Sequence, residues 1–138
     1  MSNFKINFIN HACFKIQVNN YSILVDPWFT GKVFNNSWKL LKETNIQDIH
    51  LNDLRYIFIS HEHPDHLNFE TLREIHKIKK DVKIIFPYRE DSLVKNVIEK
   101  IGFSFHFIKQ NTEKFYLDEK NFVKFFSNNP WGDHPIVF

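Results

Sequence analysis

The sequence predicts an α/β fold, and three features of the chain support that class. Residues 4–18 alternate apolar and polar side chains, which is typical of half-buried β-strands. Tyr56–Ile59 is a continuous apolar run that suits a buried central strand. Two segments with apolar residues at helical spacing follow, each leading into a further strand pattern. We therefore expect an opening β-meander and then helix–strand units, all within one domain.

The elements of the first half are defined by short patterns. Strands are expected at 4–8, 14–18 and 21–25, with Asn19-Asn20 as a two-residue hairpin turn because Asn tolerates positive φ. The third strand stops at Asp26-Pro27. Residues 28–53 are less regular, and a short helix is expected at 37–42. The central strand at 56–59 ends at Ser60.

The second half predicts two helices and several strands. Asn68 is placed to cap a helix over 69–78, and Gly102 to end a helix over 93–101. Strands are expected at 83–86, 104–108, 114–117 and 122–126. Residues 135–138 look like the start of another buried strand. From this we expect residues 1–138 to form a single domain that is incomplete at its carboxyl end.

Composition restricts the class of protein. Of 138 residues, 43% are hydrophobic and 25% are charged, the balance of a soluble globular protein. The formal net charge of +2 is too small to favour a nucleic-acid partner. Cys13, the one cysteine, excludes an internal disulfide framework. Neither a membrane span of about 18 apolar residues nor an apolar signal segment is present, so we expect a cytoplasmic protein with no membrane partner.

The segment from Ser60 to His66 carries the strongest chemical signal. His61 and His63 are two residues apart, so on an extended strand end both imidazoles project to the same side and can bind one cation. Pro64 forces a turn, after which Asp65 and His66 can reach a second cation. The alternative is a loop of solvated histidines. The spacing, and the position between a buried strand and a helix, favour metal binding over that alternative.

Residues elsewhere are candidates to complete the site. His134, 68 residues after His66 in a loop following a predicted strand, is favoured as a metal ligand over a surface loop histidine. His11 can line the site, although a structural hydrogen bond is the favoured interpretation. Asp26 is either a turn residue or an acceptor that orients a metal-bound histidine. Solvated surface positions are expected for His50 and His76, and His106, which alternates with Phe105 and Phe107, is expected to face solvent or a neighbour.

Three motifs together resemble the metallo-β-lactamase superfamily. They are Asn10-His11-Ala12-Cys13-Phe14, Leu24-Val25-Asp26-Pro27-Trp28, and the HEHPDH string behind an apolar strand. Within that superfamily the chain is most similar to the metal-binding domain of the cytidine-monophosphate N-acetylneuraminate hydroxylases and their bacterial relatives. This narrower likeness depends on residues 26–31, Phe34, Trp38, residues 59–67, Thr71-Leu72 and His134-Pro135.

The resemblance implies a metallo-β-lactamase-like αββα sandwich, of which this chain would be the amino-terminal part. It implies that His61, His63 and His134 hold one divalent metal and that Asp65 and His66 hold the other, with Asp26 near the site. Two zinc ions per complete site are expected, with iron or manganese as alternatives. Asp65 is then also the candidate catalytic residue, able to ligate, to orient the nucleophile or to shuttle a proton.

The resemblance therefore implies a hydrolase in which a metal-bound hydroxide attacks an ester, a lactone or a phosphodiester. The sequence departs from the family pattern in two ways. The family's bridging Asp and last His would lie beyond residue 138. Cys13 has no partner residues for a Rieske iron–sulfur site, which disfavours hydroxylation of a sugar nucleotide. The alternative is a catalytically silent metal-binding module that needs a partner or a second half. An exposed apolar sheet face, and self-association through it, are expected in either case.

Overall fold

A six-stranded sheet forms the centre of the computed structural model, which describes residues 4–90, 93–126 and 136–137. The first three strands pair antiparallel with one another, and the remaining pairs are parallel. In spatial order the strands are β1 (Phe4–Asn10), β2 (Cys13–Val18), β3 (Tyr21–Val25), β6 (Leu54–Phe58), β7 (Lys83–Pro87) and β8 (Ser104–Ile108). The expected meander and helix–strand units are confirmed.

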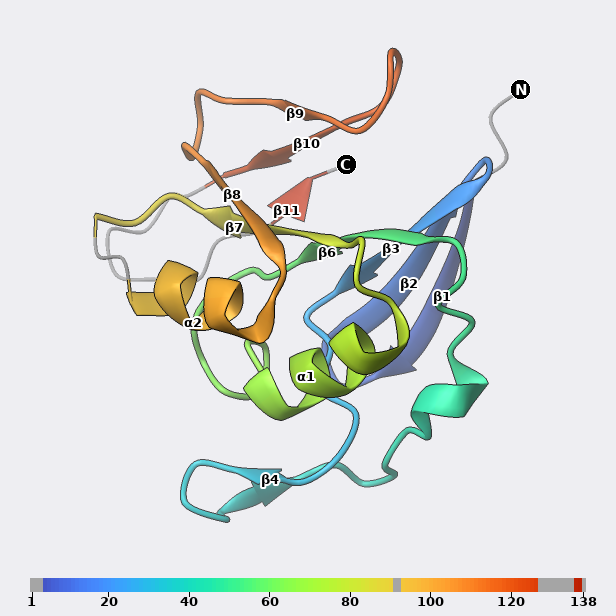
Figure 1. Cartoon of the computed structure of the whole chain (residues 1–138), viewed down its shortest axis with the longest axis vertical. Helices are drawn as coiled ribbons and strands as arrows, with labels where there is room; N and C mark the ends of the chain where they lie inside the picture. Colours follow the sequence, from blue (N-terminus) through green and yellow to red (C-terminus); the bar gives the residue numbers. More distant parts are fainter. Residues whose placement is uncertain (1–3, 91–92, 127–135, 138) are drawn as a thin grey trace.

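Helices cover one face of this sheet and a second, small sheet covers the other (Figure 1). The helices are α1 (Phe69–Ile78) and α2 (Leu93–Ile101). The second sheet contains β9 (Phe115–Tyr116), β10 (Phe122–Phe125) and β11 (Ile136–Val137). The described residues therefore form three layers, helix, sheet and sheet, of the expected αββα sandwich.

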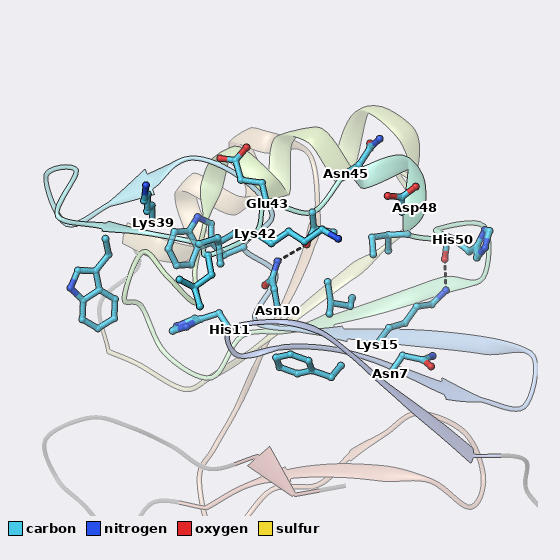
Figure 2. A pocket seen from close by; sticks show the side chains of 18 of the residues that line it. Asn7, Asn10, His11, Lys15, Lys39, Lys42, Glu43, Asn45, Asp48 and His50 are labelled. Carbon is cyan, nitrogen blue, oxygen red and sulfur yellow. Dashed lines mark hydrogen bonds between the residues drawn. The ribbon is translucent and has the colours of Figure 1, made fainter.

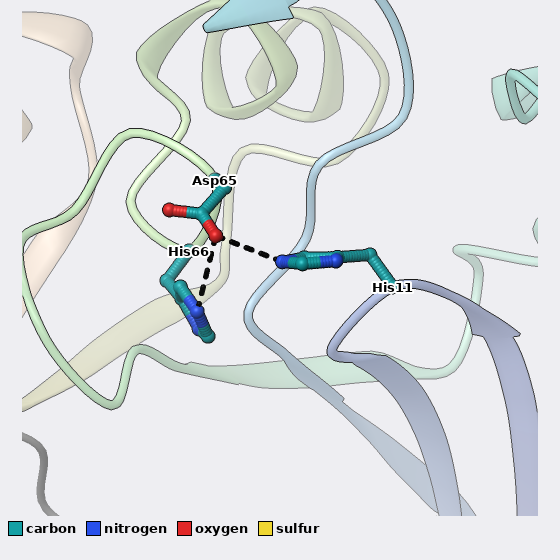
Figure 3. Close-up of side chains that lie close together, drawn as sticks. All are labelled: His11, Asp65 and His66. Carbon is teal, nitrogen blue, oxygen red and sulfur yellow. Dashed lines mark hydrogen bonds and ion pairs between the residues drawn. The ribbon is translucent and has the colours of Figure 1, made fainter. Parts of the chain in front are cut away.

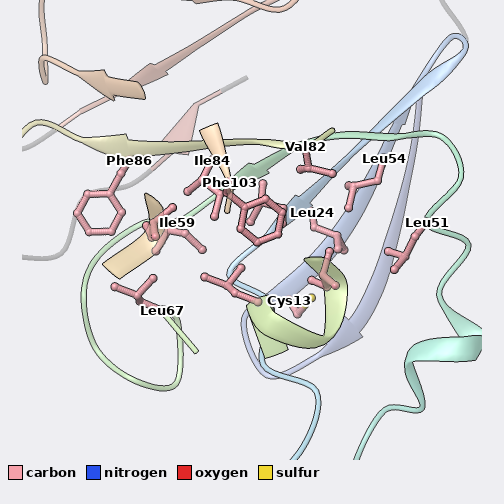
Figure 4. Packing of buried hydrophobic residues seen from close by; sticks show 14 of the residues in the cluster. Cys13, Leu24, Leu51, Leu54, Ile59, Leu67, Val82, Ile84, Phe86 and Phe103 are labelled. Atoms are coloured by element: carbon pink, nitrogen blue, oxygen red, sulfur yellow. The ribbon is translucent and has the colours of Figure 1, made fainter. Parts of the chain in front are cut away.

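Each face of the sheet has its own hydrophobic core because successive strand residues point to opposite sides. Ile57 and Ile84 pack toward the helices with Leu72 and Ile98 (the cluster of Figure 4), whereas the neighbouring Phe58 packs toward the second sheet. Asn68 caps α1 by accepting a hydrogen bond from the Thr71 amide at 2.9 Å. This fixes the start of α1 directly after the histidine-rich loop.

The expected helix at 37–42 is wrong. Trp38–Lys39 is instead β5, which pairs with β4 (Lys32–Val33) in a hairpin. Phe34, Asn35 and Asn36 turn the hairpin at φ values of 51°, 53° and 66°. The tertiary contact of Val33 and Leu40 with the buried Trp28 overrides the local helical pattern. A short 3₁₀ helix, η1 (Ile46–Asp48), was also not predicted.

The apolar side of β1 is exposed rather than half-buried. Phe4, Ile6 and Phe8 are 55%, 56% and 65% exposed, although Ile16, the partner of Ile6 on β2, is buried. Within the described residues the second sheet covers β2 onward, but no element packs on this side of β1. The apolar sheet face expected from the sequence is therefore present as a strip along β1.

The carboxyl ends of β1, β3 and β6 meet at one edge of the sheet. β1 is antiparallel to β2, and β2 to β3, so β1 and β3 run in the same direction, parallel to β6. In open α/β sheets this edge is where ligands bind. Among the described residues, no helix is long and apolar enough to cross a membrane.

Candidate metal centre

The histidine-rich loop is a tight turn between β6 and α1. The backbone amides of His66 and Leu67 both donate to the carbonyl of His63, at 2.9 and 2.7 Å. The Asn68 side chain donates to the carbonyl of Pro64 at 3.1 Å. These bonds fold the loop back on itself, so that residues adjacent in sequence direct their side chains to a common space.

His61 and His63 form a pair of facing imidazoles. His61 Nε2 lies 2.9 Å from His63 Nδ1, and the two ring centroids are 4.6 Å apart. His61 is buried and its Nδ1 lies 2.9 Å from the Ser60 hydroxyl oxygen, so its Nε2 is the nitrogen that faces His63. The structure thus brings together the two residues predicted to share a cation.

Asp26 stands behind the histidines at the end of β3. Its Oδ1 accepts the Ser60 amide at 2.7 Å, and its Oδ2 accepts the Ser60 hydroxyl at 2.6 Å. Oδ2 also lies 2.8 Å from His66 Nδ1. Because a carboxylate only accepts, His66 Nδ1 donates to Asp26, which leaves Nε2 directed toward Asp65 and the cluster. Asp26 thus makes the contacts of an orienting acceptor as well as ending the strand at φ 42°.

Asp65, His66 and His11 form a second group beside the histidine pair (Figure 3). Asp65 Oδ2 lies 2.8 Å from His11 Nε2 and 3.4 Å from His66 Nε2. The His61 and His66 rings are 4.1 Å apart, so the two groups adjoin. One potential ligand atom from each of His11, Asp65 and His66 lies within 4.8 Å of the others. His11 is therefore in the cluster itself, through the hydrogen bond that the sequence analysis favoured.

The cluster fits a divalent cation on two observations. Asp65 is 5% exposed, and its Oδ1 has no hydrogen-bond partner among the described residues. A buried carboxylate oxygen without a partner is costly unless a cation satisfies it. The donor set of imidazole nitrogens and carboxylate oxygens is also the one that zinc, iron and manganese accept.

The other histidines and Cys13 were also considered as metal ligands, and one of them lies outside the described residues. His134 lies outside the described residues, so its ligation stays a prediction. His106 is paired with Glu113 at 3.5 Å and His50 is exposed, both away from the cluster. His76 packs edge-on against Phe103 and is half-buried rather than solvated. Burial, and then the negative charge of Asp26, raise the pKa of the Cys13 thiol, which disfavours it as a thiolate ligand.

Sequence reasoning missed the aromatic surroundings of the cluster. Trp28 and Trp38 pack edge-on against His11 at 5.5 and 6.5 Å, and Phe34 contacts His63 at 6.1 Å between ring centroids. Phe34 and Trp38 come from the β4–β5 hairpin, which the sequence did not reveal. The Asn35-Asn36 pair between Phe34 and Trp38 was the available signal, because Asn tolerates the positive φ of a hairpin turn.

The chain belongs to the β-lactamase superfamily, because the family profile described as the beta-lactamase superfamily domain matches residues 5–128. Divalent-metal binding is implied by this membership. The resemblance found in the sequence is thus confirmed at the level of the superfamily.

The chain is also similar in sequence to characterised proteins. The chain is 34% identical over 80 residues to cytidine monophosphate-N-acetylneuraminic acid hydroxylase of Danio rerio, covering 57% of this chain and 14% of that protein. It is 31% identical over 102 residues to the Xenopus laevis protein of the same name, covering 66% and 17%. This chain therefore spans less than a fifth of the length of these relatives.

Two solved structures share the fold. CmlA, a diiron β-hydroxylase from Streptomyces venezuelae, aligns with a TM-score of 0.68 at 17% identity over 91% of this chain and 24% of that one. Igni18, a metallo hydrolase from Ignicoccus hospitalis, aligns with a TM-score of 0.66 at 19% identity over 97% and 55%. These likenesses confirm the metallo-β-lactamase-like fold.

Proposed function

We propose that the chain carries the metal centre of a divalent-metal-dependent hydrolase acting on an ester, a lactone or a phosphodiester. The supporting observation is the convergence of His61, His63, Asp65, His66 and His11 at the carboxyl ends of three strands. The superfamily, and a structural neighbour described as a metallo hydrolase, support the same class.

The residues of the cluster take separate roles in this proposal. His61 and His63, together with His134, hold one cation, and Asp65, His66 and His11 face the second position. Zinc is the proposed metal, with iron or manganese as alternatives. A bound divalent ion supplies Lewis acidity to the substrate oxygen and lowers the pKa of bound water.

The carboxylates position the reacting groups. Asp26 keeps the proton of His66 on Nδ1, so that its Nε2 stays directed at the centre. Asp65 directs Oδ2 toward His11 and His66, so this oxygen is placed to ligate, to orient a water molecule or to accept its proton. His11 Nε2 lies 2.8 Å from Asp65 Oδ2 and thereby holds that carboxylate in position.

A second candidate function is a metal-binding module without turnover of its own. Only His61 and His63 form the first ligand group among the described residues, and two imidazoles hold a cation weakly without a third ligand. The relatives are hydroxylases by name and CmlA is a diiron enzyme, so a non-hydrolytic use of the same ligands is the corresponding alternative.

Turnover by the metal-loaded chain tests the proposal. We expect hydrolysis of bis(4-nitrophenyl) phosphate or 4-nitrophenyl acetate that requires added zinc, iron or manganese. Asp65→Asn should lower the rate about 100-fold, a usual loss for a positioned acid–base group. Asp81→Asn, which changes an exposed carboxylate away from the site, should not change it. Bound metal with no turnover above that of the free ion would reject the hydrolase and leave the binding module.

A further inference from the structure

A long groove runs from the candidate metal centre along the outer strands of the main sheet. It has a volume of about 1280 Å³ and lies between the β1–β2 hairpin and residues 37–50 (Figure 2). His11 lines one end of it, and His11 Nε2 is bonded to Asp65 of the cluster. Figure 2 shows His11 at one side of the groove and His50 at the opposite side. A molecule lying in the groove would reach the metal centre with one end.

Exposed aromatic rings stand where the groove meets the metal centre. Trp38 is 54% exposed and contacts both His11 and Phe34, whose ring centroid is 5.2 Å from its own. Phe34 is turned out at φ 51°, a conformation that a bulky residue rarely adopts. Rings left open to solvent beside a polar centre offer a stacking surface for a flat group.

Lysines outnumber carboxylates in the groove, which is lined by Lys5, Lys15, Lys39 and Lys42 and by Glu43, Asp48 and Asp53. Two of its carboxylates are already used within the protein: Glu43 accepts the Gly31 amide at 2.9 Å, and Asp53 is paired with Lys15 at 2.9 Å. Lys39 and Lys42 line the groove from the same segment of the chain as Trp38, and neither has an ion pair among the described residues. Figure 2 shows the Lys42 side chain extended over Asn10. These ammonium groups attract an anion into the groove.

We propose that this groove binds a small organic anion that carries a flat ring, with the ring on Trp38 and the charged group on Lys39 and Lys42. The anion is a phosphoryl or a carboxylate group, because both meet a lysine ammonium in the same way. As a substrate site this inference depends on the proposed hydrolase, but the ligand class is testable by binding alone.

Calorimetry on the metal-free full chain tests the groove without interference from anion binding to a metal. The probes are phenylphosphonate and benzoate (ring and anion), benzyl alcohol (ring alone) and inorganic phosphate (anion alone). The double variant Lys39→Gln, Lys42→Gln removes the charges, and Trp38→Ala or Trp38→Leu removes the ring. The matched controls are Lys80→Gln with Lys120→Gln, and Tyr116→Ala, which change exposed residues outside the groove.

We expect the ring-bearing anions to bind more tightly than benzyl alcohol or phosphate. The double lysine variant should weaken phenylphosphonate about fivefold and leave benzyl alcohol unchanged. The Trp38 variants should weaken both ring probes about five- to tenfold and leave phosphate unchanged. A stronger effect on phenylphosphonate than on benzoate would assign the phosphoryl group, and the reverse would assign the carboxylate.

Two results would overturn the inference: no saturable binding of either ring-bearing anion, or equal losses in the groove variants and their controls. Circular dichroism of each variant separates loss of the groove from loss of the fold, and Trp38→Leu keeps an apolar side chain on β5 for that purpose. Binding without turnover would reject the hydrolase but keep the groove. Turnover without binding of the ring-bearing anions would keep the hydrolase and reject the groove as their binding site.

Discussion

At the residue scale, Asp26 organises the candidate metal centre from behind its histidines. It is 4% exposed and receives hydrogen bonds from the Ser60 amide, the Ser60 hydroxyl and His66 Nδ1. One carboxylate thereby fixes both the start of the histidine-rich loop and the orientation of a ligand ring. Such supporting residues contribute to metal affinity although they do not touch the metal.

Asp26→Asn tests this role. The amide introduces an N–H donor opposite the Ser60 and His66 donors, so we expect a loss of about 1–3 kcal/mol in the free energy of unfolding. Metal affinity should fall about 10- to 100-fold. Urea unfolding and metal titration measure the two effects. Asp81→Asn is the control, because Asp81 is an exposed carboxylate that pairs with Lys79 among the described residues, and it should change neither quantity. Unchanged metal affinity in Asp26→Asn would contradict the orienting role.

Much of the site is predictable at this scale because its signal is local. The spacing of His61, His63, Asp65 and His66 follows from a strand end and a proline turn within six residues. His11 is 54 residues from Asp65, and only the pairing of β1 with β2 and β3 places its ring on that carboxylate. No local pattern encodes such a contact, so the sequence alone left His11 between two interpretations.

At the element scale, Gly102 joins α2 to β8 and is held by two constraints. Its φ of 113° is open to glycine and rarely adopted by other residues. A Cβ at this position would lie 2.6 Å from the ring of His76 on α1. The glycine therefore permits both the reversal of the chain and the approach of the two helices, beyond the helix-ending role expected from the sequence.

We expect Gly102→Ala to lower the free energy of unfolding by about 1–3 kcal/mol, from the positive φ and the contact together. Gly31→Ala serves as the matched control, since Gly31 also has a positive φ, 83°, but its nearest neighbour atom, on Glu70, is 3.4 Å away. His76→Ala in the Gly102→Ala background should recover part of the loss. Thermal unfolding of the four proteins measures it, and equal losses in both glycine variants would show that the His76 contact is unimportant.

The β9–β10 turn gives the fold a dependence on pH through Asp118. Hydrogen bonds from the Asn121 side chain, and then from the Lys120 and Asn121 amides, lower the pKa of Asp118. An unfolded aspartate titrates near pH 3.9, about the value of model peptides. The stabilisation is therefore complete above that pH and is lost as the pH falls through the lower folded pKa.

Asp118→Asn should consequently lower the melting temperature at pH 7 and reduce the further fall between pH 5 and pH 2. Glu119→Gln, at the exposed neighbour, should show the pH dependence of the unchanged chain. Melting curves across that interval test the linkage. An undiminished fall in Asp118→Asn would show that other carboxylates account for it.

Elements whose pattern agrees with their tertiary contacts were predictable, and the β4–β5 hairpin was not. The apolar residues of α1 and of β6 point to the core that their periodicity implies. In the 37–42 segment, Leu40 instead joins Trp28 and Val33 in a small cluster that a single helix could not form. A contact between distant residues decided the conformation there.

At the scale of the whole molecule, an apolar strip lies along the outer side of β1. Phe8 packs edge-on against Phe14 at 5.4 Å, and both remain open to solvent along with Phe4 and Ile6. Contiguous exposed apolar surface of this kind marks a site of association. The self-association expected from the sequence, the single domain and the cytoplasmic location all stay predictions.

The strip predicts binding of the dye anilinonaphthalene sulfonate by the folded chain, measured in the Trp38→Leu background so that the ring of the groove does not contribute. Phe8→Ser with Ile6→Thr should remove most of that fluorescence while changing the free energy of unfolding by less than about 1 kcal/mol, because both side chains are exposed. Ile78→Thr, at an exposed residue of α1, should leave the fluorescence unchanged. Fluorescence retained in the double variant would place the apolar surface elsewhere.

The central claim is that the cluster at the carboxyl ends of β1, β3 and β6 binds metal. Elemental analysis of the purified full chain tests it most directly, with His61→Ala, His63→Ala as the variant and His50→Ala, His106→Ala as the control pair away from the cluster. The account predicts close to two divalent ions per chain, lost in the variant and kept in the control. Equal metal content in all three proteins would contradict it.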